Sequence, residues 1–163
     1  MSAVFSECGR KRFRLERDLG REGPTVAMLG VNPSMAGAEA NDATIRKDIG
    51  FGERLGWGRL IKGNLFALVS TDIKGLRVLT TGRDIENDAH LEQIMRDADI
   101  VVACWGPPEK VPAHLRNRWL RVVQIAAEIG KPLHCIGTTS GGHPRHPLMT
   151  PYSTPLTVWS PPR

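Results

Sequence analysis

Three apolar stretches of the sequence lead into polar side chains of types that can catalyse hydrolysis. Asn32 follows the run "TVAMLGV", Asn64 lies in "GNLFAL", and His146 lies in "GTTSGGHPRHPL". An asparagine amide offers both donors and an acceptor, so it can read the edge of a base or hold a water molecule without ionising. A histidine can donate to a developing anion at neutral pH. We therefore predict that Asn32, Asn64 and His146 belong to a functional site.

Further polar residues lie close to Asn32 and His146 in the sequence. We predict that these also bind substrate, namely Ser34, Asn41, Asp42, Arg46 and Arg145. Each residue taken alone has a structural explanation, because asparagines close turns through backbone hydrogen bonds and Asp42 can cap a helix. Their grouping in a few loops favours a functional site.

The apolar periodicity predicts strands that alternate with helices. Buried strands are expected at residues 25–31, 58–70, 99–106 and 132–137, and helices at 43–55 (capped by Asn41 or Asp42), from Asn87 to about 98, and at 112–130. Residues 10–19 alternate like a half-exposed strand, or form a basic arm that becomes ordered on nucleic acid. The alternation predicts one α/β domain over residues 1–163, a three-layer α/β/α sandwich around a mainly parallel sheet.

In such sheets, ligands bind beyond the carboxyl ends of the strands. The loops that contain Asn32, Asn64 and His146 each follow a predicted strand. We therefore expect these three side chains to share a polar cleft, with Asp42 and Arg46 at its rim.

The net charge of +5 is concentrated towards the C-terminus. Residues 110–163 contain seven Lys and Arg but one acid, whereas the rest of the chain is nearly balanced. A basic segment favours an anionic partner, so we consider nucleic acid or a nucleotide, with Arg145 in the cleft and Arg116, Arg118 or Arg121 extending the positive surface. The alternative is a solvated helix face.

Several functional classes lack their motifs. GxxxxGK[ST], GxGxxG after the first buried strand and GxSxG are absent, so we expect no P-loop, no dinucleotide cofactor and no hydrolase elbow. "TTSGGHP" is consistent with either a phosphate-binding loop or a flexible turn. His143 and His146 lack the frame of a zinc pair, so we expect no metal and no other cofactor. Three cysteines without a CxxC pair, no signal peptide and no membrane segment favour a cytoplasmic protein.

The ordered motifs "NPSMAGAEANDATIRK", "GNLFAL", "VVACWG" and "GTTSGGHPRHPL" resemble a bacterial and phage family catalogued as domain of unknown function 1643. A more distant resemblance is to the uracil-DNA glycosylase superfamily. "LGVNPS" is similar to its first motif, in which an asparagine matching Asn32 positions the hydrolytic water. "HPL" resembles its His-Pro-Ser motif, and Asn64 matches the asparagine that reads the uracil edge. The chain departs from these motifs at Ser34 and Leu148, and "NDATIRK" has no counterpart in the glycosylases.

The glycosylase resemblance implies a hydrolase that acts at a base or an N-glycosidic bond. In this interpretation Asn32 orients water, Asn64 reads the base and His146 stabilises the leaving anion. Two alternatives stay open. One is a module that binds nucleotide or nucleic acid without chemistry, and the other is a hydrolase or transferase for a small phosphorylated substrate.

Overall fold

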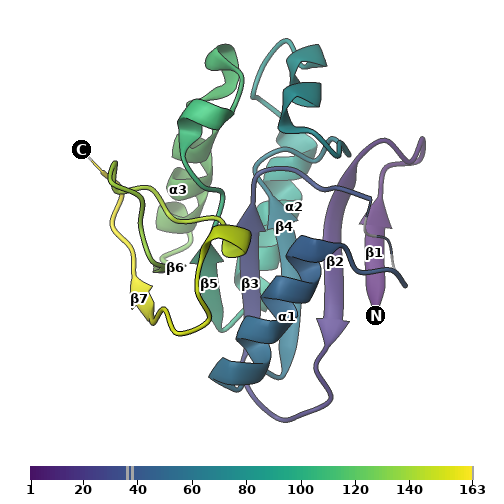
Figure 1. Cartoon of the computed structure of the whole chain (residues 1–163). Coiled ribbons are helices and arrows are strands. Elements are labelled where there is room, and N and C mark those ends of the chain that lie inside the picture. The colour runs from purple at the N-terminus through teal and green to yellow at the C-terminus, as the bar shows by residue number, and fades with distance from the viewer. Residues whose placement is uncertain (36, 38, 163) are drawn as a thin grey trace.

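The protein folds around a seven-stranded mixed sheet that is covered by helices (Figure 1). The computed structural model describes residues 1–35, 37 and 39–162. In these residues the strands are β1 (Ser2–Phe5), β2 (Arg12–Asp18), β3 (Thr25–Gly30), β4 (Arg59–Asn64), β5 (Ile100–Ala103), β6 (Leu133–Ile136) and β7 (Leu156–Val158). The α-helices are α1 (Ala43–Leu55), α2 (Ile85–Asp97) and α3 (Arg118–Glu128), and short 3-10 helices are η1 (Ile73–Val78), η2 (Pro108–Lys110), η3 (Ala113–Leu115) and η4 (Pro147–Met149). The predicted α/β class is confirmed.

The strand order β1-β2-β4-β3-β5-β6-β7 makes the sheet parallel in the middle and antiparallel at its edges. Strands β4, β3, β5 and β6 pair in parallel, whereas β2 pairs antiparallel with β4 and β1, and β7 pairs antiparallel with β6. The expectation of a mainly parallel sheet is therefore corrected. Two consecutive strands can run parallel in one sheet only if a crossover of a dozen or more residues connects them. The link between β2 and β3 is shorter than this, so β2 runs antiparallel to the central strands.

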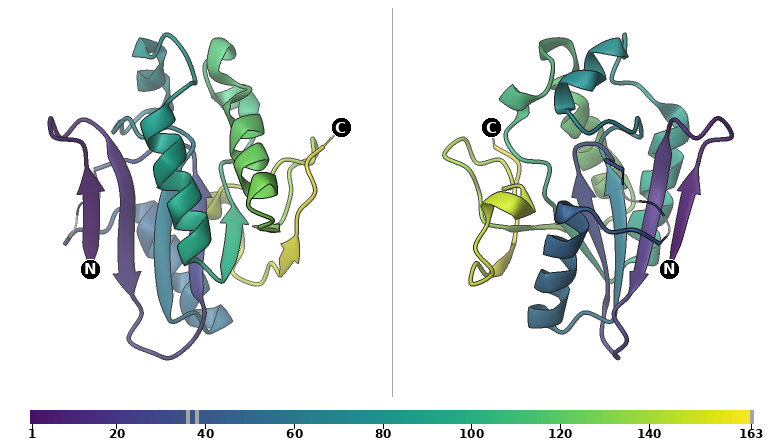
Figure 2. Two further views of the ribbon diagram at one scale, coloured as in Figure 1. Left: turned by 180° about the vertical axis from the view of Figure 1, so that it is seen from behind. Right: turned by 45° about the vertical axis from the view of Figure 1, so that its right-hand side comes forward.

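The helices form layers on both faces of the sheet, with α1 on one face and α2 and α3 on the other (Figures 1 and 2). Helix α1 has the predicted bounds, and Asp42 is its cap, since Asp42 Oδ1 accepts the backbone N–H of Ile45 at 2.8 Å. The helix ends at Gly56, whose φ of 72° is a left-handed conformation that favours glycine.

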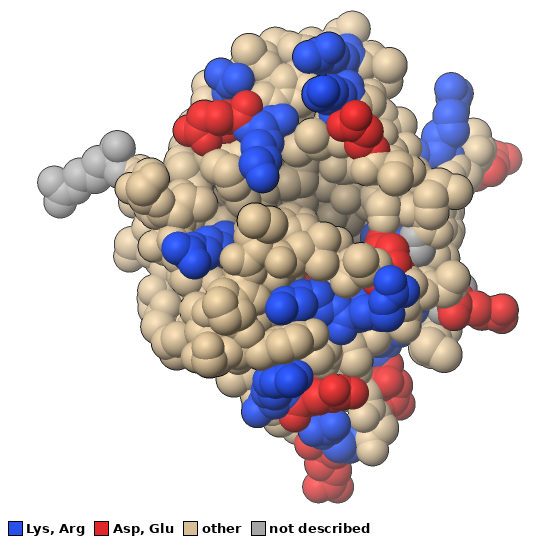
Figure 3. Space-filling view, in the orientation of Figure 1, with Lys and Arg blue, Asp and Glu red and all other residues tan. Residues whose placement is uncertain are grey.

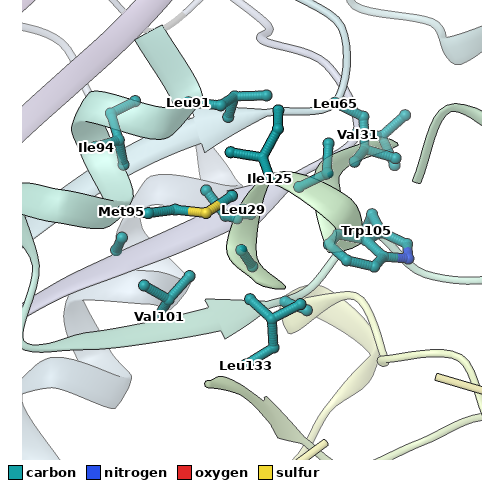
Figure 4. Close-up of a cluster of buried hydrophobic side chains, with 14 of the residues drawn as sticks. Leu29, Val31, Leu65, Leu91, Ile94, Met95, Val101, Trp105, Ile125 and Leu133 are labelled. Carbon is teal, nitrogen blue, oxygen red and sulfur yellow. The ribbon is translucent and has the colours of Figure 1, made fainter. Parts of the chain in front are cut away.

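Strand β3 is buried on both faces and divides the core in two. Ala27 and Leu29 belong to the larger apolar cluster, which lies against α2 and α3, and Val26 and Met28 belong to the cluster beneath α1. Figure 4 shows the larger cluster, in which sheet residues such as Leu29 meet residues of α2 and α3. A continuous apolar run is what a central strand buried on both faces requires.

Two predicted helix starts are corrected by the structure. Helix α2 is capped by Asp84, and Asn87 lies inside the helix, where it is buried and donates to the backbone oxygens of Asn64 and Leu65. The helix predicted from residue 112 begins at Arg118, because the chain first makes the separate short turn η3.

Arg118 connects the helices α2 and α3 to the end of strand β4. Its side chain is buried, its Nε donates to the Leu65 carbonyl at 2.7 Å, and its Nη2 lies 2.5 Å from Asp88 Oδ1. Together with Asn87, it satisfies backbone oxygens that the strand leaves without partners where it ends. The backbone of Asn64 is thus fixed from the face of the sheet that α2 and α3 cover.

We predict that Arg118→Met lowers the free energy of unfolding by about 3 kcal/mol, because it leaves Asp88 and the Leu65 carbonyl with fewer buried partners. Arg121 also pairs with Asp88 but is more exposed, so Arg121→Met should cost less than about 1 kcal/mol. Denaturant unfolding of the two variants measures the difference. Equal losses would contradict a special structural role for Arg118.

Candidate functional site at the carboxyl ends of the parallel strands

A cavity of about 500 Å³ lies at the carboxyl ends of β3 and β4, beside the start of α1. Figure 3 shows this face hollowed above α1, with side chains of both charges nearby. Five of the eight residues predicted from the sequence line the cavity, namely Asn32, Ser34, Asp42, Asn64 and His146. The chain thus brings together the three side chains that were expected to share a cleft.

The other three predicted residues lie outside this cavity. Asn41 Oδ1 accepts a hydrogen bond from Arg17 Nε, and Arg46 donates to the backbone oxygen of Asn41. Arg145 Nε donates to the Thr138 carbonyl, so the expectation that Arg145 lines the cleft beside His146 is wrong. Adjacent residues in a loop direct their side chains to different sides, which spacing in the sequence does not reveal.

The amide of Asn32 is held in one orientation by the backbone. Its Nδ2 donates to the Ser70 carbonyl at 2.8 Å and to the Pro33 carbonyl at 3.2 Å. Both amide hydrogens are therefore used, and Oδ1 is the atom that can accept from a ligand or a water molecule.

Asn64 lines the cavity and is almost wholly buried. The residue is 3% exposed, and its Nδ2 has no hydrogen-bond acceptor among the described residues. Gly30 makes room for it, since a Cβ at position 30 would lie 2.9 Å from Asn64 Oδ1 and 3.3 Å from Lys62 Nζ. A side chain at position 30 would therefore displace both groups.

His146 is held as a neutral donor. Its Nδ1 accepts the backbone N–H of Leu148 at 3.3 Å, so the hydrogen of the neutral ring resides on Nε2. Burial, followed by the charges of Lys62 and Lys110, lowers the pKa of His146 to about 4, against the opposing effect of Asp42. The ring is therefore uncharged at neutral pH.

Asp42 supplies an ionised carboxylate to the same cavity. Burial disfavours its charge, but hydrogen bonds from Ser34 and from the Ile45 backbone, with the charges of Arg12 and Lys62, lower its pKa overall. The residue thus both caps α1 and faces the cavity with a negative charge.

Sequence reasoning missed the cationic and aromatic part of the lining, which comprises Arg12, Lys62, Trp105 and Lys110. Lys62 is buried and its Nζ lies 2.8 Å from Asp48 Oδ2 on α1. A lysine inside the apolar strand "LIKGN" was a usable signal, because lysine is almost never fully buried without a partner. Trp105 carries no comparable signal.

The three arginines that were predicted to extend a positive surface from this cavity have other partners. Arg118 is buried against Asp88, Arg121 pairs with Asp88 and Glu128, and Arg116 donates to the carbonyls of Glu109 and Val111. A larger cavity of about 760 Å³ lies between α2 and α3, but its Arg118, Arg121 and Asp88 already pair with one another. We therefore place the candidate site at the strand ends.

His143 and His146 do not form a metal site with each other. His143 packs edge-on against Trp119, whereas His146 lines the cavity, so the two histidines do not converge. Within the described part of the chain, no three His, Cys, Asp or Glu residues are grouped as a metal site requires. No helix in that part combines the length and apolarity needed to cross a bilayer.

The family described as "Protein of unknown function (DUF1643)" matches residues 12–148. The chain belongs to this family. The DUF1643 match begins at the first residue of β2 and includes every residue named above as lining the cavity. Searches of curated proteins and of solved structures found no match.

We predict that the imidazole of His146 titrates with a midpoint of about pH 4, followed by NMR of its ring carbons and assigned by the loss of the signal in His146→Gln. The unfolded chain protonates this residue near its ordinary pKa of about 6.5. Lowering the pH from about 6.5 towards 4 should therefore reduce the free energy of unfolding, and His146→Gln should lack this component. A midpoint near 6.5 would show that the ring is solvated and not held in the cavity.

Proposed function

We propose that this protein is a hydrolase that binds a nucleobase in the cavity and cleaves the N-glycosidic bond of a nucleotide or nucleic acid. The observation that supports it is the convergence of Asn32, Asn64 and His146, which are far apart in the sequence, on one cavity where the Asn64 amide nitrogen is buried without an acceptor. A buried donor without a partner costs about 1–3 kcal/mol, which a ligand oxygen would recover.

The donors in the cavity suit the edge of a base. Trp105 Nε1, like Asn64 Nδ2, is buried and has no acceptor among the residues that the structure describes. Ring carbonyl oxygens and ring nitrogens are the acceptors that a base presents. Asn64 would therefore bind the base edge, as an amide beside a bound base commonly does.

Asn32 and Asp42 suit the activation of water. The fixed Oδ1 of Asn32 accepts from a water molecule, and the ionised Asp42 favours the positive charge that develops on the sugar as the bond breaks. The water oxygen forms the new bond to the sugar carbon, and the electron pair of the N-glycosidic bond leaves with the base. The proton of the water passes to solvent or to the base.

His146 suits the stabilisation of the departing base. Its Nε2–H belongs to a neutral ring at physiological pH, and this N–H can donate a hydrogen bond to the anion of the base. A single donor preorganised in this way contributes about 10²–10³ in rate.

A binding module without chemistry is the second candidate. Three cationic side chains, Arg12, Lys62 and Lys110, line the cavity with the acids Asp42 and Asp72. These cationic side chains are also consistent with a phosphorylated ligand that is held and not cleaved.

We predict that the protein produces abasic sites in at least one oligonucleotide of a panel containing uracil, hypoxanthine or mismatched bases, detected by alkaline cleavage. His146→Gln should lower kcat/KM about 100-fold. His143→Gln is the matched control, because His143 lies in the same loop but outside the cavity, and it should leave kcat/KM unchanged.

No cleavage of any single- or double-stranded oligonucleotide would refute the proposed hydrolase. Binding of the same oligonucleotides or of free nucleotides, measured by anisotropy over a salt series, would then identify the binding module. Its affinity should fall as the salt concentration rises.

A further inference from the structure

Lys62 is a buried cation that lines the cavity. Its side chain is 4% exposed, and Lys62 lines the cavity together with Asn64, which lies two residues further along β4. Residues two apart in a strand point to the same face of the sheet. A Cβ at position 30 would lie 3.3 Å from Lys62 Nζ and 2.9 Å from Asn64 Oδ1, so both groups lie against the same side of Gly30, which also lines the cavity.

The partners of Lys62 leave one of its hydrogens available. The ammonium group has three N–H donors. One points to Asp48 Oδ2 at 2.8 Å, and a second points to Cys104 Sγ at 3.6 Å. The third can therefore reach a ligand in the cavity that Lys62 lines.

We propose that Lys62 contacts the bound base and stabilises the negative charge that the base acquires when the N-glycosidic bond breaks. This inference rests on the proposed function and names a substrate-contacting residue that the sequence motifs did not indicate. The bonds that form and break are those of the reaction above. The electron pair of the N-glycosidic bond moves to the ring nitrogen, and Lys62 keeps its proton throughout. One consequence is that the cavity prefers an anionic ring to a neutral ring of the same size.

The surroundings keep Lys62 charged. Burial disfavours the ammonium, but the Asp48 carboxylate beside it raises the pKa of Lys62 above its ordinary value. Burial raises the pKa of the Cys104 thiol to about 12, so this thiol stays neutral and Asp48 is the counter-ion. The charge of Lys62 in turn helps, after burial, to lower the pKa of His146. Lys62 therefore supplies a fixed positive charge, and His146 supplies a neutral hydrogen-bond donor.

The test compares two free bases of similar size, 5-nitrouracil, which is largely ionised at neutral pH, and thymine, which is neutral. Calorimetry should give at least about tenfold tighter binding of 5-nitrouracil to the native protein, because a charge-assisted hydrogen bond is stronger than a neutral one. Asp48→Asn removes the counter-ion that keeps Lys62 charged, so this single variant should weaken the preference. The double variant Asp48→Asn with Lys62→Met removes both charges at similar volume and should bind the two bases equally.

Removing the pair together avoids a buried aspartate without a counter-ion, which Lys62→Met alone would leave. If the methionine variant does not fold, the double variant Asp48→Asn with Lys62→Gln is used in its place. The glutamine then gives the new amide at position 48 a hydrogen-bond partner. A native protein that binds neither base or prefers thymine, or a double variant that keeps the preference for 5-nitrouracil, overturns the assignment.

The cleavage assay separates this inference from the proposed function. If no oligonucleotide is cut but the preference for 5-nitrouracil still depends on Lys62, the hydrolase proposal fails and Lys62 stands as an anion-contacting residue. If oligonucleotides are cut equally fast by the native protein and by the double variant, the hydrolase stands and the role of Lys62 is refuted.

Discussion

The buried ion pair of Lys62 and Asp48 is the interaction on which the arrangement around the cavity depends. It links β4 in the sheet to α1 in the layer above it, directly beside the strand end that carries Asn64. Both charges leave water, and such a pair is often no more stabilising than apolar residues of the same volume. Stability alone therefore does not explain its presence. A position in the wall of a cavity gives the lysine a further use that an apolar pair would not provide.

The two faces of the sheet divide the work between packing and polar chemistry. On the far face, α2 and α3 bury most of the apolar core, and Asn87 and Arg118 also hold the backbone oxygens at the end of β4. On the face that α1 covers, Lys62 and Asn64 line the cavity beside the start of α1. The end of β4 has its backbone fixed from one face and directs its polar side chains to the other face. The geometry of the site therefore depends on both helix layers.

Local patterns predicted much of the fold and part of the site. Helix α1 and its cap Asp42 follow from short-range periodicity and capping chemistry, and the meeting of Asn32 and Asn64 follows from the parallel strands that carry them. The antiparallel edges, the outward direction of Arg145 and the burial of Arg118 were not predictable in this way. Each depends on contacts between segments distant in the sequence, as when Arg118 reaches the Leu65 carbonyl.

The charge of Lys62 acts on both ionisable groups that the proposed reaction uses. The positive charge of Lys62 contributes to lowering the pKa of Asp42, whose carboxylate form is the one able to favour a cationic sugar. The same charge contributes to lowering the pKa of His146, whose neutral form is the one able to donate to a departing anion. Both shifts favour loss of a proton and so lower the charge of each group by one, which makes Asp42 anionic and His146 neutral. The cation in the wall therefore favours, together with burial of His146 and the hydrogen bonds to Asp42, the two forms that the proposed reaction uses, an anionic Asp42 and, above about pH 4, a neutral His146.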